Sequence, residues 1–263
     1  MTCFAQQKQG IDRIMRVMIT RPAEDGAPLA ANLKARGIDS LIVPLMKIVH
    51  LPGPPLDLTG VQALLVTSAN GVRAFAARNA QRDRIVCAVG QATAHAARDA
   101  GFLRIATAAG DVDSLADMVR RALNPAGGTL LHVAGSIVAG DLAAQLRDAG
   151  FCCRREVLYE ALRVERLPEP AATELREGAL DGVVLYSPRT ARIFVDLACS
   201  AALAGPCSAM TAWCLSAAVA EQAQAITWRR VAIATHPDSA AMLDVIAGSA
   251  DGVGRAGPDF VSP

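Results

Sequence analysis

Five short turns of small or hydroxyl-bearing residues could bind an anion through their backbone. Each stands between an apolar run and a segment with helical spacing: Thr67-Ser68 with Asn70, Gly90, Gly135-Ser136, Ser187 and Ser216. A helix N-terminus exposes unpaired N–H groups and carries partial positive charge, so it favours anions. Ser and Thr at such places often serve only to cap the helix. Both roles can hold together, because a cap at the carboxyl end of a strand already faces the usual ligand crevice of α/β proteins.

Two further side chains are candidates for the same site. Arg21 opens the loop after the first apolar run, where its guanidinium could meet a carboxylate. His236 lies in Thr235-His236-Pro237-Asp238-Ser239, which repeats the pattern of Asp111-Val112-Asp113-Ser114 as a helix-capping, anion-binding loop. The alternative for both side chains is an exposed position without a ligand.

The turns are positioned by strands and helices that alternate along the chain. Apolar runs predict strands at 16–20, 39–44, 62–67, 85–89, 103–107, 129–134, 154–159, 182–186, 212–215 and 230–234. Helical spacing predicts helices that end near Arg36, that cover 70–79, 91–100, 114–123, 140–149, 170–177, 189–204 and 217–224, and that open after Ser239. Strands that alternate with helices predict an α/β fold with parallel sheets flanked by helices.

The chain repeats its own pattern, which predicts two lobes. Residues 17–44 resemble 130–159, and each of these segments is followed by a proline-rich stretch, at 51–57 and 167–170. Proline fits neither a helix interior nor a central strand, so these stretches are interpreted as linkers. The first segment would then pair with the last third of the chain, while the middle forms an inserted lobe joined by two crossings. One ligand gripped between the lobes is the expected use of their matching turns.

The expected boundaries follow from that pairing. They are lobe 1 at 16–46 plus 165–248, inserted lobe 2 at 62–160, linkers at 47–61 and 161–168, a disordered extension at 1–15 and a loose tail at 249–263.

Composition narrows the class of protein. The chain is 52% hydrophobic and 19% charged, as expected of a globular protein, and its net charge of +1 gives no field that would favour nucleic acid or an anionic membrane. No apolar run approaches the roughly 18 residues of a membrane span, and the polar start is unlike a signal peptide. Seven scattered cysteines and four dispersed histidines predict a reduced, cytoplasmic protein without a metal site.

In their order and spacing, these motifs resemble the uroporphyrinogen-III synthase family over residues 16–248. The resemblance rests on Thr20-Arg21-Pro22, Thr67-Ser68-Ala69-Asn70-Gly71, Val89-Gly90-x-x-Thr93-Ala94, Gly135 to Gly140, Val157-x-Tyr159, Ser187-Pro188 and His236-Pro237-x-Ser239-Ala240. The sequence departs from the family at Leu215-Ser216-Ala217, where relatives often have Gly-Pro or Ser-Pro. It also departs at Gly135-Ser136, which lacks the basic residue that many relatives place there.

The resemblance implies a two-lobed fold and a cyclising hydro-lyase of porphyrin, tetrapyrrole and heme biosynthesis. Its substrate would be hydroxymethylbilane, a linear tetrapyrrole with eight carboxylates, with hand-over by the synthase that makes it as a further expectation. The enzyme would remove the terminal hydroxyl as water, close the chain and invert ring D to give uroporphyrinogen III. The resemblance implies no cofactor, no nucleic-acid or membrane partner, and a monomer.

Tyr159 is the candidate catalytic residue under this resemblance. A phenol has a pKa of about 10, so at neutral pH it is protonated and can donate to the departing hydroxyl. Tyr159 ends a predicted strand at the expected lobe junction, and packing against the linker is the alternative role. The main task would be geometric, because the substituted carbon of ring D must reach the cation that remains when water departs.

Two other functions fit the same sequence. A non-catalytic, two-lobed cytosolic protein that closes on a small polyanion would use the same turns. A regulatory α/β domain would usually show an acidic phosphoacceptor cluster at a strand end, and none is evident. Fold alone does not choose among these functions.

Overall fold

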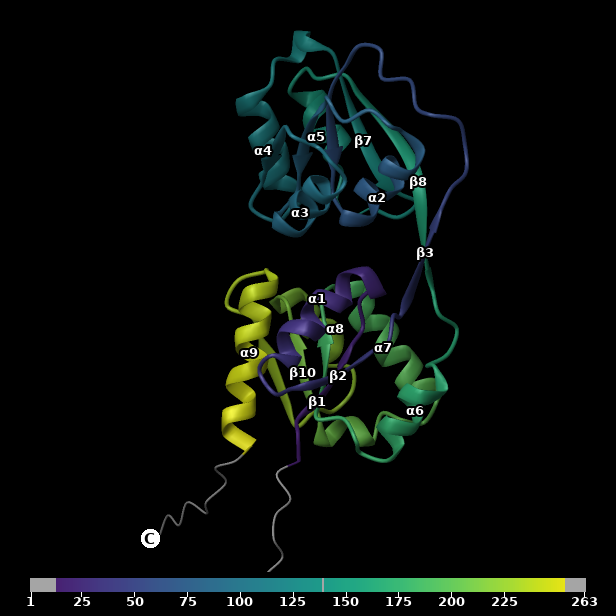
Figure 1. Cartoon of the computed structure of the whole chain (residues 1–263), viewed down its shortest axis with the longest axis vertical. Coiled ribbons are helices and arrows are strands. Elements are labelled where there is room, and N and C mark those ends of the chain that lie inside the picture. Colours follow the sequence, from purple (N-terminus) through teal and green to yellow (C-terminus); the bar gives the residue numbers. More distant parts are fainter. Residues whose placement is uncertain (1–12, 139, 254–263) are drawn as a thin grey trace, which may run out of the picture. The chain divides into compact units, whose positions relative to one another are not determined.

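A computed structural model describes residues 13–138 and 140–253, which form two compact units. Unit 1 contains the described residues up to Leu45 and from Glu165 onwards, and unit 2 contains those of Met46–Val164 (Figure 1). In the described parts of the chain, no helix is long and apolar enough to cross a membrane.

Unit 1 is built on a five-stranded parallel sheet with the order β11-β10-β9-β1-β2. Its strands are β1 (Arg16–Ile19), β2 (Asp39–Ile42), β9 (Gly182–Leu185), β10 (Thr211–Cys214) and β11 (Arg230–Ile233). Its helices are α1 (Ala23–Lys34), α6 (Glu169–Arg176), α7 (Pro188–Ser200), α8 (Ala217–Ala223) and α9 (Ser239–Val253), with a short 3-10 helix η2 (Pro206–Ala209).

Both faces of this sheet are covered, because successive side chains of a strand point to opposite faces. On one face, Leu33 of α1 and Met242 of α9 join a buried cluster with Val17 and Trp213 of the sheet. On the other face, α7 and α8 pack against each other and against β9 and β10. Strands buried on both faces are typical of parallel sheets and explain the continuous apolar runs in the sequence.

Unit 2 is built on a six-stranded sheet with the order β3-β8-β7-β4-β5-β6. Its strands are β3 (Met46–His50), β4 (Val61–Val66), β5 (Ile85–Ala88), β6 (Ile105–Thr107), β7 (Thr129–Gly135) and β8 (Cys153–Arg163). Its helices are α2 (Ala69–Arg78), α3 (Gln91–Asp99), α4 (Val112–Ala122) and α5 (Leu142–Asp148), with a short 3-10 helix η1 (Pro125–Gly127).

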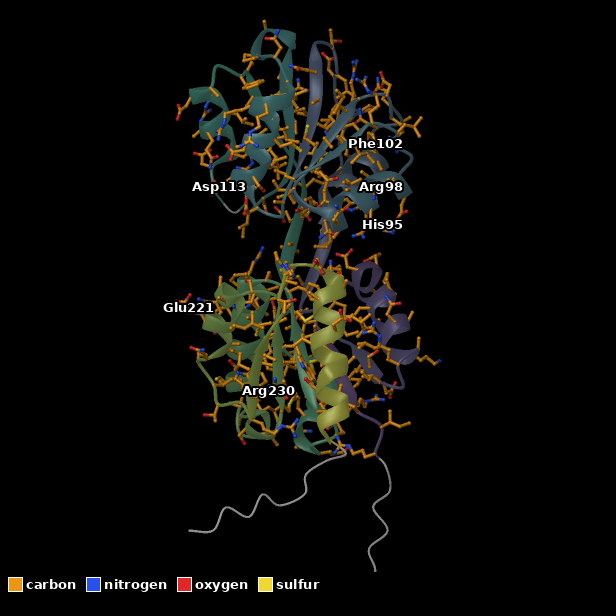
Figure 2. The ribbon with its side chains drawn as sticks, turned by 90° about the vertical axis from the view of Figure 1, so that its left-hand side faces the viewer. His95, Arg98, Phe102, Asp113, Glu221 and Arg230 are labelled. Carbon is orange, nitrogen blue, oxygen red and sulfur yellow. The ribbon has the colours of Figure 1, made fainter. Side chains whose placement is uncertain are left out.

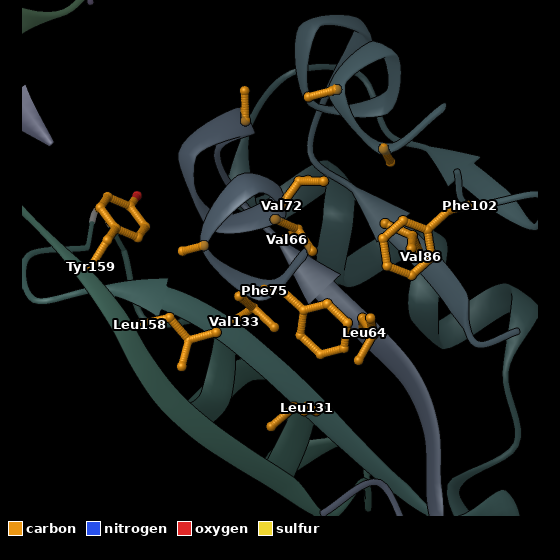
Figure 3. Close-up of a cluster of buried hydrophobic side chains, with 14 of the residues drawn as sticks. Leu64, Val66, Val72, Phe75, Val86, Phe102, Leu131, Val133, Leu158 and Tyr159 are labelled. Carbon is orange, nitrogen blue, oxygen red and sulfur yellow. The ribbon is translucent and has the colours of Figure 1, made fainter. Parts of the chain in front are cut away.

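Two buried clusters hold unit 2 together, one on each face of its sheet. Phe75 of α2 and Phe102, which follows α3, pack beside Leu64 of β4 on the first face (Figure 3). Leu115 of α4 lies in the second cluster, together with Leu65 of β4. Complete burial of one such side chain stabilises the fold by about 1.5–3 kcal/mol.

The two sheets share one strand order. The order β8-β7-β4-β5-β6 in unit 2 corresponds strand for strand to β2-β1-β9-β10-β11 in unit 1. These five strands are parallel in each unit, so their carboxyl ends lie along a single edge of each sheet. The turns that follow the strands therefore gather at that edge, which is where α/β proteins bind ligands.

Residues 46–50 form a strand where the sequence predicted the last residue of lobe 1 and the start of the linker at 47–61. β3 pairs antiparallel with the end of β8, and β8 in turn runs to Arg163, inside the second predicted linker at 161–168. The pairing supplies backbone hydrogen bonds to a segment whose own side chains are only partly buried. The proline-rich residues 51–57 that follow form neither helix nor strand.

The described part of unit 1 begins before residue 16 and ends after residue 248, the limits that the sequence suggested for lobe 1. Residues 1–12 and 254–263 lie outside the described residues, but Met15 is buried in the core of unit 1 and Arg13 donates to the carbonyls of Gly178 and Ala179. At the other end α9 continues to Val253 instead of ending near 248. Its residue Ser249 accepts a hydrogen bond from the Trp213 indole N–H at 3.1 Å, which satisfies a donor on a buried side chain.

Candidate functional site

The sheet topology brings the candidate residues of each unit to one edge. In unit 1 they follow β1, β9, β10 and β11, and are Arg21, Ser187, Ser216 and His236. In unit 2 they lie at or after the ends of β4, β5 and β7, and are Thr67, Ser68, Asn70, Gly90, Gly135 and Ser136. Tyr159 belongs to β8 and lies opposite Gly135 in the pairing with β7.

Four helices at these edges begin without an acidic residue. Helices α2, α3, α7 and α8 have no acid in their first turn, and their N-cap residues are Ser68, Gly90, Ser187 and Ser216. Two of these helices belong to each unit. Their unpaired N–H groups and partial positive charge are available to balance an anion.

The other long helices at these edges carry acids at their starts. Asp111, Asp141 and Asp238 each accept a backbone N–H from the first turn of α4, α5 and α9. Helix α1 has Glu24 and Asp25 in its first turn. A carboxylate already in place balances the partial charge of the helix and would repel a second anion. The helix starts without an acidic residue are therefore the candidate places for a carboxylate ligand.

The hydroxyls of Ser68 and Ser187 act as helix caps. Ser68 Oγ accepts the N–H of Asn70 at 3.1 Å, and Ser187 Oγ accepts the N–H of Thr190 at 3.1 Å. The capping role that the sequence left as an alternative is thus present at both turns. Ser216 precedes α8 without a side-chain cap bond, so its hydroxyl is not committed to the helix.

Tyr159 lies across Gly135. The register of the β7–β8 pairing shifts between Ala134 and Gly135, and Leu158 and Tyr159 both enter the same buried cluster. Neighbours in a regular strand point to opposite faces, so this bulge re-aims Tyr159. A β-carbon at position 135 would lie 2.8 Å from Tyr159 Cζ, which explains why glycine stands there. Figure 3 shows the Tyr159 ring at the margin of the cluster, apart from Phe75.

Arg155 holds the turn after β7 and was not predicted from the sequence. Its Nη2 donates to the carbonyl oxygen of Gly135 at 2.9 Å and to that of Ser136 at 3.2 Å. On the other side of the turn, the Ser136 N–H donates to the Tyr159 carbonyl at 3.0 Å. The Gly135-Ser136 turn lacks a basic residue of its own, and the neighbouring strand supplies one. The only sequence signal was an arginine inside a predicted strand.

Arg21 is held in a defined orientation at the edge of unit 1. Its guanidinium carbon lies 4.3 Å from the centroid of the Tyr186 ring, and its Nη2 lies 3.5 Å from Asp25 Oδ2. A cation over an aromatic face and beside a carboxylate loses little further freedom when it binds a ligand. The side chain of Arg21 is 18% exposed, so one part of it reaches solvent.

Tyr186, directly before the Ser187 turn, is a second residue that the sequence analysis missed. Its hydroxyl oxygen is buried and has no hydrogen-bond partner of normal geometry in the described structure, although Ser239 and Arg21 lie near it. Burial raises the pKa of Tyr186, and the charge of Arg21 offsets part of that rise. The phenol therefore stays protonated at neutral pH.

His236 occupies a less favourable position for an anion. It is exposed, its Nδ1 lies 3.3 Å from Thr235 Oγ1, and its loop ends in the acidic cap Asp238. His132 of β7 is buried instead, and burial followed by the charge of Arg155 lowers its pKa to about 4. Among the described residues, no group of three or more His, Cys, Asp or Glu side chains could hold a metal ion.

Comparisons with known proteins agree on one family. A family model described as uroporphyrinogen-III synthase HemD matches residues 27–244. The chain is 29% identical over 200 residues to the uroporphyrinogen-III synthase of Chlorobaculum parvum, an alignment that covers 68% of this chain and 78% of that protein.

Solved structures of uroporphyrinogen III synthases have a similar fold. A mutant enzyme from Thermus thermophilus gives a TM-score of 0.54 at 16% identity and covers 91% of this chain and 99% of its own. The Helicobacter pylori protein gives 0.56 at 17% identity and covers 90% and 100%. At these identities the likeness concerns the fold alone, and it confirms the predicted fold class.

Proposed function

The chain belongs to the uroporphyrinogen-III synthase family, whose members are cyclising lyases, and from this premise we propose that it converts hydroxymethylbilane to uroporphyrinogen III with loss of water and inversion of ring D. The observation that carries the proposal is the set of four helix starts without an acidic residue, two at the carboxyl edge of each sheet. They offer donors for a ligand with eight carboxylates on a protein whose net charge is only +1.

Binding on this account uses local donors rather than an overall positive field. Backbone N–H groups at the starts of α2, α3, α7 and α8 would donate hydrogen bonds to substrate carboxylates, with Arg21 adding a charge-assisted contact. Thr67, Asn70 and Ser216 would add side-chain hydrogen bonds. Gly90 would contribute through the backbone of its turn, whereas the space beside Gly135 is occupied by the Tyr159 ring. His236 would contribute least, because an acid-capped helix follows it.

The chemistry begins when the hydroxyl of the substrate leaves as water. We propose that the Tyr159 phenol gives its proton to this hydroxyl while the pyrrole nitrogen pushes the C–O bond apart, leaving an azafulvene-type cation. The substituted carbon of ring D then attacks the cation to give a spiro intermediate, and fragmentation with reclosure inverts ring D. The carbon at which the ring closes finally loses a proton, which restores the Tyr159 phenol, so that water is the only net product besides the closed ring. The support for Tyr159 is its fixed position over Gly135, beside the turn after β7.

Isomer choice distinguishes this function from passive binding. Free hydroxymethylbilane closes directly to the type I isomer, so the protein must impose the bend that exposes the substituted carbon of ring D. We propose that the protein acts as a cytoplasmic monomer and receives its short-lived substrate from the synthase that makes it. Without hand-over, direct closure in solution would compete with the enzyme.

The decisive test supplies hydroxymethylbilane in situ from its synthase and resolves the oxidised product isomers. The proposal requires type III product in excess when the protein is present, and type I when it is omitted. Type I alone, with the coupling enzyme shown to be active, would overturn the proposal. It would instead favour a non-catalytic protein that binds a polyanion.

A further inference from the structure

We propose that Arg155 binds a carboxylate of the substrate at the turn after β7 and thereby helps to determine which isomer forms. This inference rests on the proposed function and adds a residue to the same site. It follows from the contacts of Arg155, from its charge balance and from its place beside the turn that adjoins Tyr159.

The contacts of Arg155 leave donors free for a ligand. Both of its hydrogen bonds in the described structure start from Nη2 and end on the carbonyl oxygens of Gly135 and Ser136. The N–H groups on Nη1 and Nε have no partner among the described residues. A guanidinium offers five donors in a fixed fork that matches a carboxylate. The side chain is exposed, so a ligand can reach it.

The charge of Arg155 is not balanced within the described residues. The carbonyl oxygens that it contacts are neutral, and it forms no ion pair there, whereas the adjacent Arg154 lies 3.6 Å from Glu156 Oε1 and donates to the carbonyl of Asp57. On the adjacent strand β7, Arg155 is paired with His132, which is neutral because burial and this same positive charge disfavour its protonation. An uncompensated cation at a ligand edge points to an anionic ligand.

The position of Arg155 connects carboxylate binding to the chemistry. The turn that it holds is also fixed by the Ser136 N–H, which donates to the Tyr159 carbonyl. A carboxylate on Arg155 would therefore fix the substrate relative to the Tyr159 phenol. Weaker anchoring would let the substrate leave before ring D is inverted, and direct closure would then give the type I isomer.

The test compares Arg155→Gln, Arg155→Lys and the control Arg121→Gln. Arg121 is an exposed arginine in the last turn of α4, at the opposite end of that helix from its capped N-terminus. R121Q changes the net charge of the protein by the same amount as R155Q. We expect R155Q to raise the KM for hydroxymethylbilane about tenfold, with kcat within about threefold and a larger share of type I product, as one lost charge-assisted contact predicts. R155K should return the KM to within about threefold of wild type, and R121Q should match wild type.

A second readout does not depend on turnover. The Kd for uroporphyrin III, measured by fluorescence, should rise about tenfold in R155Q at low salt, and the difference should shrink at high salt, where exposed charges are screened. Unchanged KM and Kd in R155Q would overturn the inference. It would also be overturned if the weaker KM and Kd of R155Q were not restored in R155K and accompanied a fall in thermal stability, because that result would indicate a purely structural role. If R155Q does not fold, Arg155→Met takes its place: a Kd about tenfold weaker than wild type at low salt supports the inference, and an equal Kd overturns it.

The two proposals fail separately. Type I product alone from the wild-type protein overturns the proposed function, while uroporphyrin III binding still tests Arg155. Type III product from wild type and from R155Q with equal KM overturns only the role of Arg155.

Discussion

The phenol ring of Tyr159 lies so close over Gly135 that a β-carbon there would be 2.8 Å from Cζ and 3.1 Å from the hydroxyl oxygen. The side chain is only 8% exposed, so the ring has little room to withdraw. The position of Tyr159, the candidate acid, is thus determined by Gly135 at the end of β7 and by the register shift between β7 and β8.

Gly135→Ala should therefore act on Tyr159. The added methyl group must push the ring aside, because the nearest atoms belong to a rigid aromatic side chain. We expect a loss of stability of about 1–3 kcal/mol, as for other overpacked sites, and a fall in kcat comparable to that of Tyr159→Phe. Gly205→Ala is the matched control, since a β-carbon there meets nothing within 4 Å. Equal kcat for G135A and wild type would show that the ring position does not matter.

Tyr159→Phe removes the hydroxyl and keeps the packing. If the phenol assists departure of the substrate hydroxyl, kcat should fall by about a hundredfold, at the lower end of general-acid effects. The product should remain type III, because the fold of the substrate and not the acid sets the isomer. Quenched assays measure kcat and the product isomer for wild type and Y159F, and melting curves compare the thermal stability of the two proteins. Turnover equal to wild type would remove Tyr159 from the mechanism.

Tyr186→Phe should stabilise the protein. The Tyr186 hydroxyl is buried without a well-formed hydrogen bond, so its removal spares a desolvation cost of about 1 kcal/mol or more. The ring would still support the guanidinium of Arg21, so substrate KM should not change. Urea unfolding of the two proteins measures the difference. A destabilised variant would show that the hydroxyl has a partner after all, with Ser239 the first candidate.

His132 should make the protein sensitive to acid. Its folded pKa of about 4 lies below its ordinary value of 6.5, because burial disfavours the charged form. Below pH 6.5 the unfolded chain takes up a proton that the folded protein resists, so stability is full above pH 6.5 and is lost as the pH falls towards 4. The free energy of unfolding that is lost in this way is on the order of 3 kcal/mol.

The variant His132→Leu isolates this contribution. Unfolding free energies between pH 7 and pH 4 should fall less steeply in H132L than in wild type, and the exposed control His95→Gln should follow wild type. Parallel curves for H132L and wild type would mean that other groups cause the acid sensitivity.

Local signals in the sequence predicted most of the fold. The α/β class followed from strand and helix periods, and Gly37 and Gly101, which end helices, have positive φ values of 73° and 90° as such positions require. Asp111 forms the predicted cap, including a capping box with Ser114. The strand β3 was missed because its stability comes from pairing with β8, far along the chain.

The candidate site was predicted less completely, because part of it also depends on contacts between residues far apart in the sequence. Turns after strands are local features, so Ser68, Ser187 and the other small residues could be identified directly. Arg155 donates to the carbonyls at and after the end of a neighbouring strand, and Tyr186 packs against Arg21 from the loop after β1, far away in the sequence. Such relations depend on sheet order and register, which residue types and spacing do not specify.

The central claim is that helix starts without an acidic residue bind substrate carboxylates, and Ser68→Asp in unit 2 and Ser187→Asp in unit 1 test it most directly. Aspartate caps a helix as well as serine does and suits its dipole, so stability should hold or rise. The added charge should nevertheless weaken binding of uroporphyrin III about tenfold or more in each variant. Asp111→Ser, the reverse change at an acid-capped helix, should not weaken binding. A Kd that stays at the wild-type value in both aspartate variants would contradict the account.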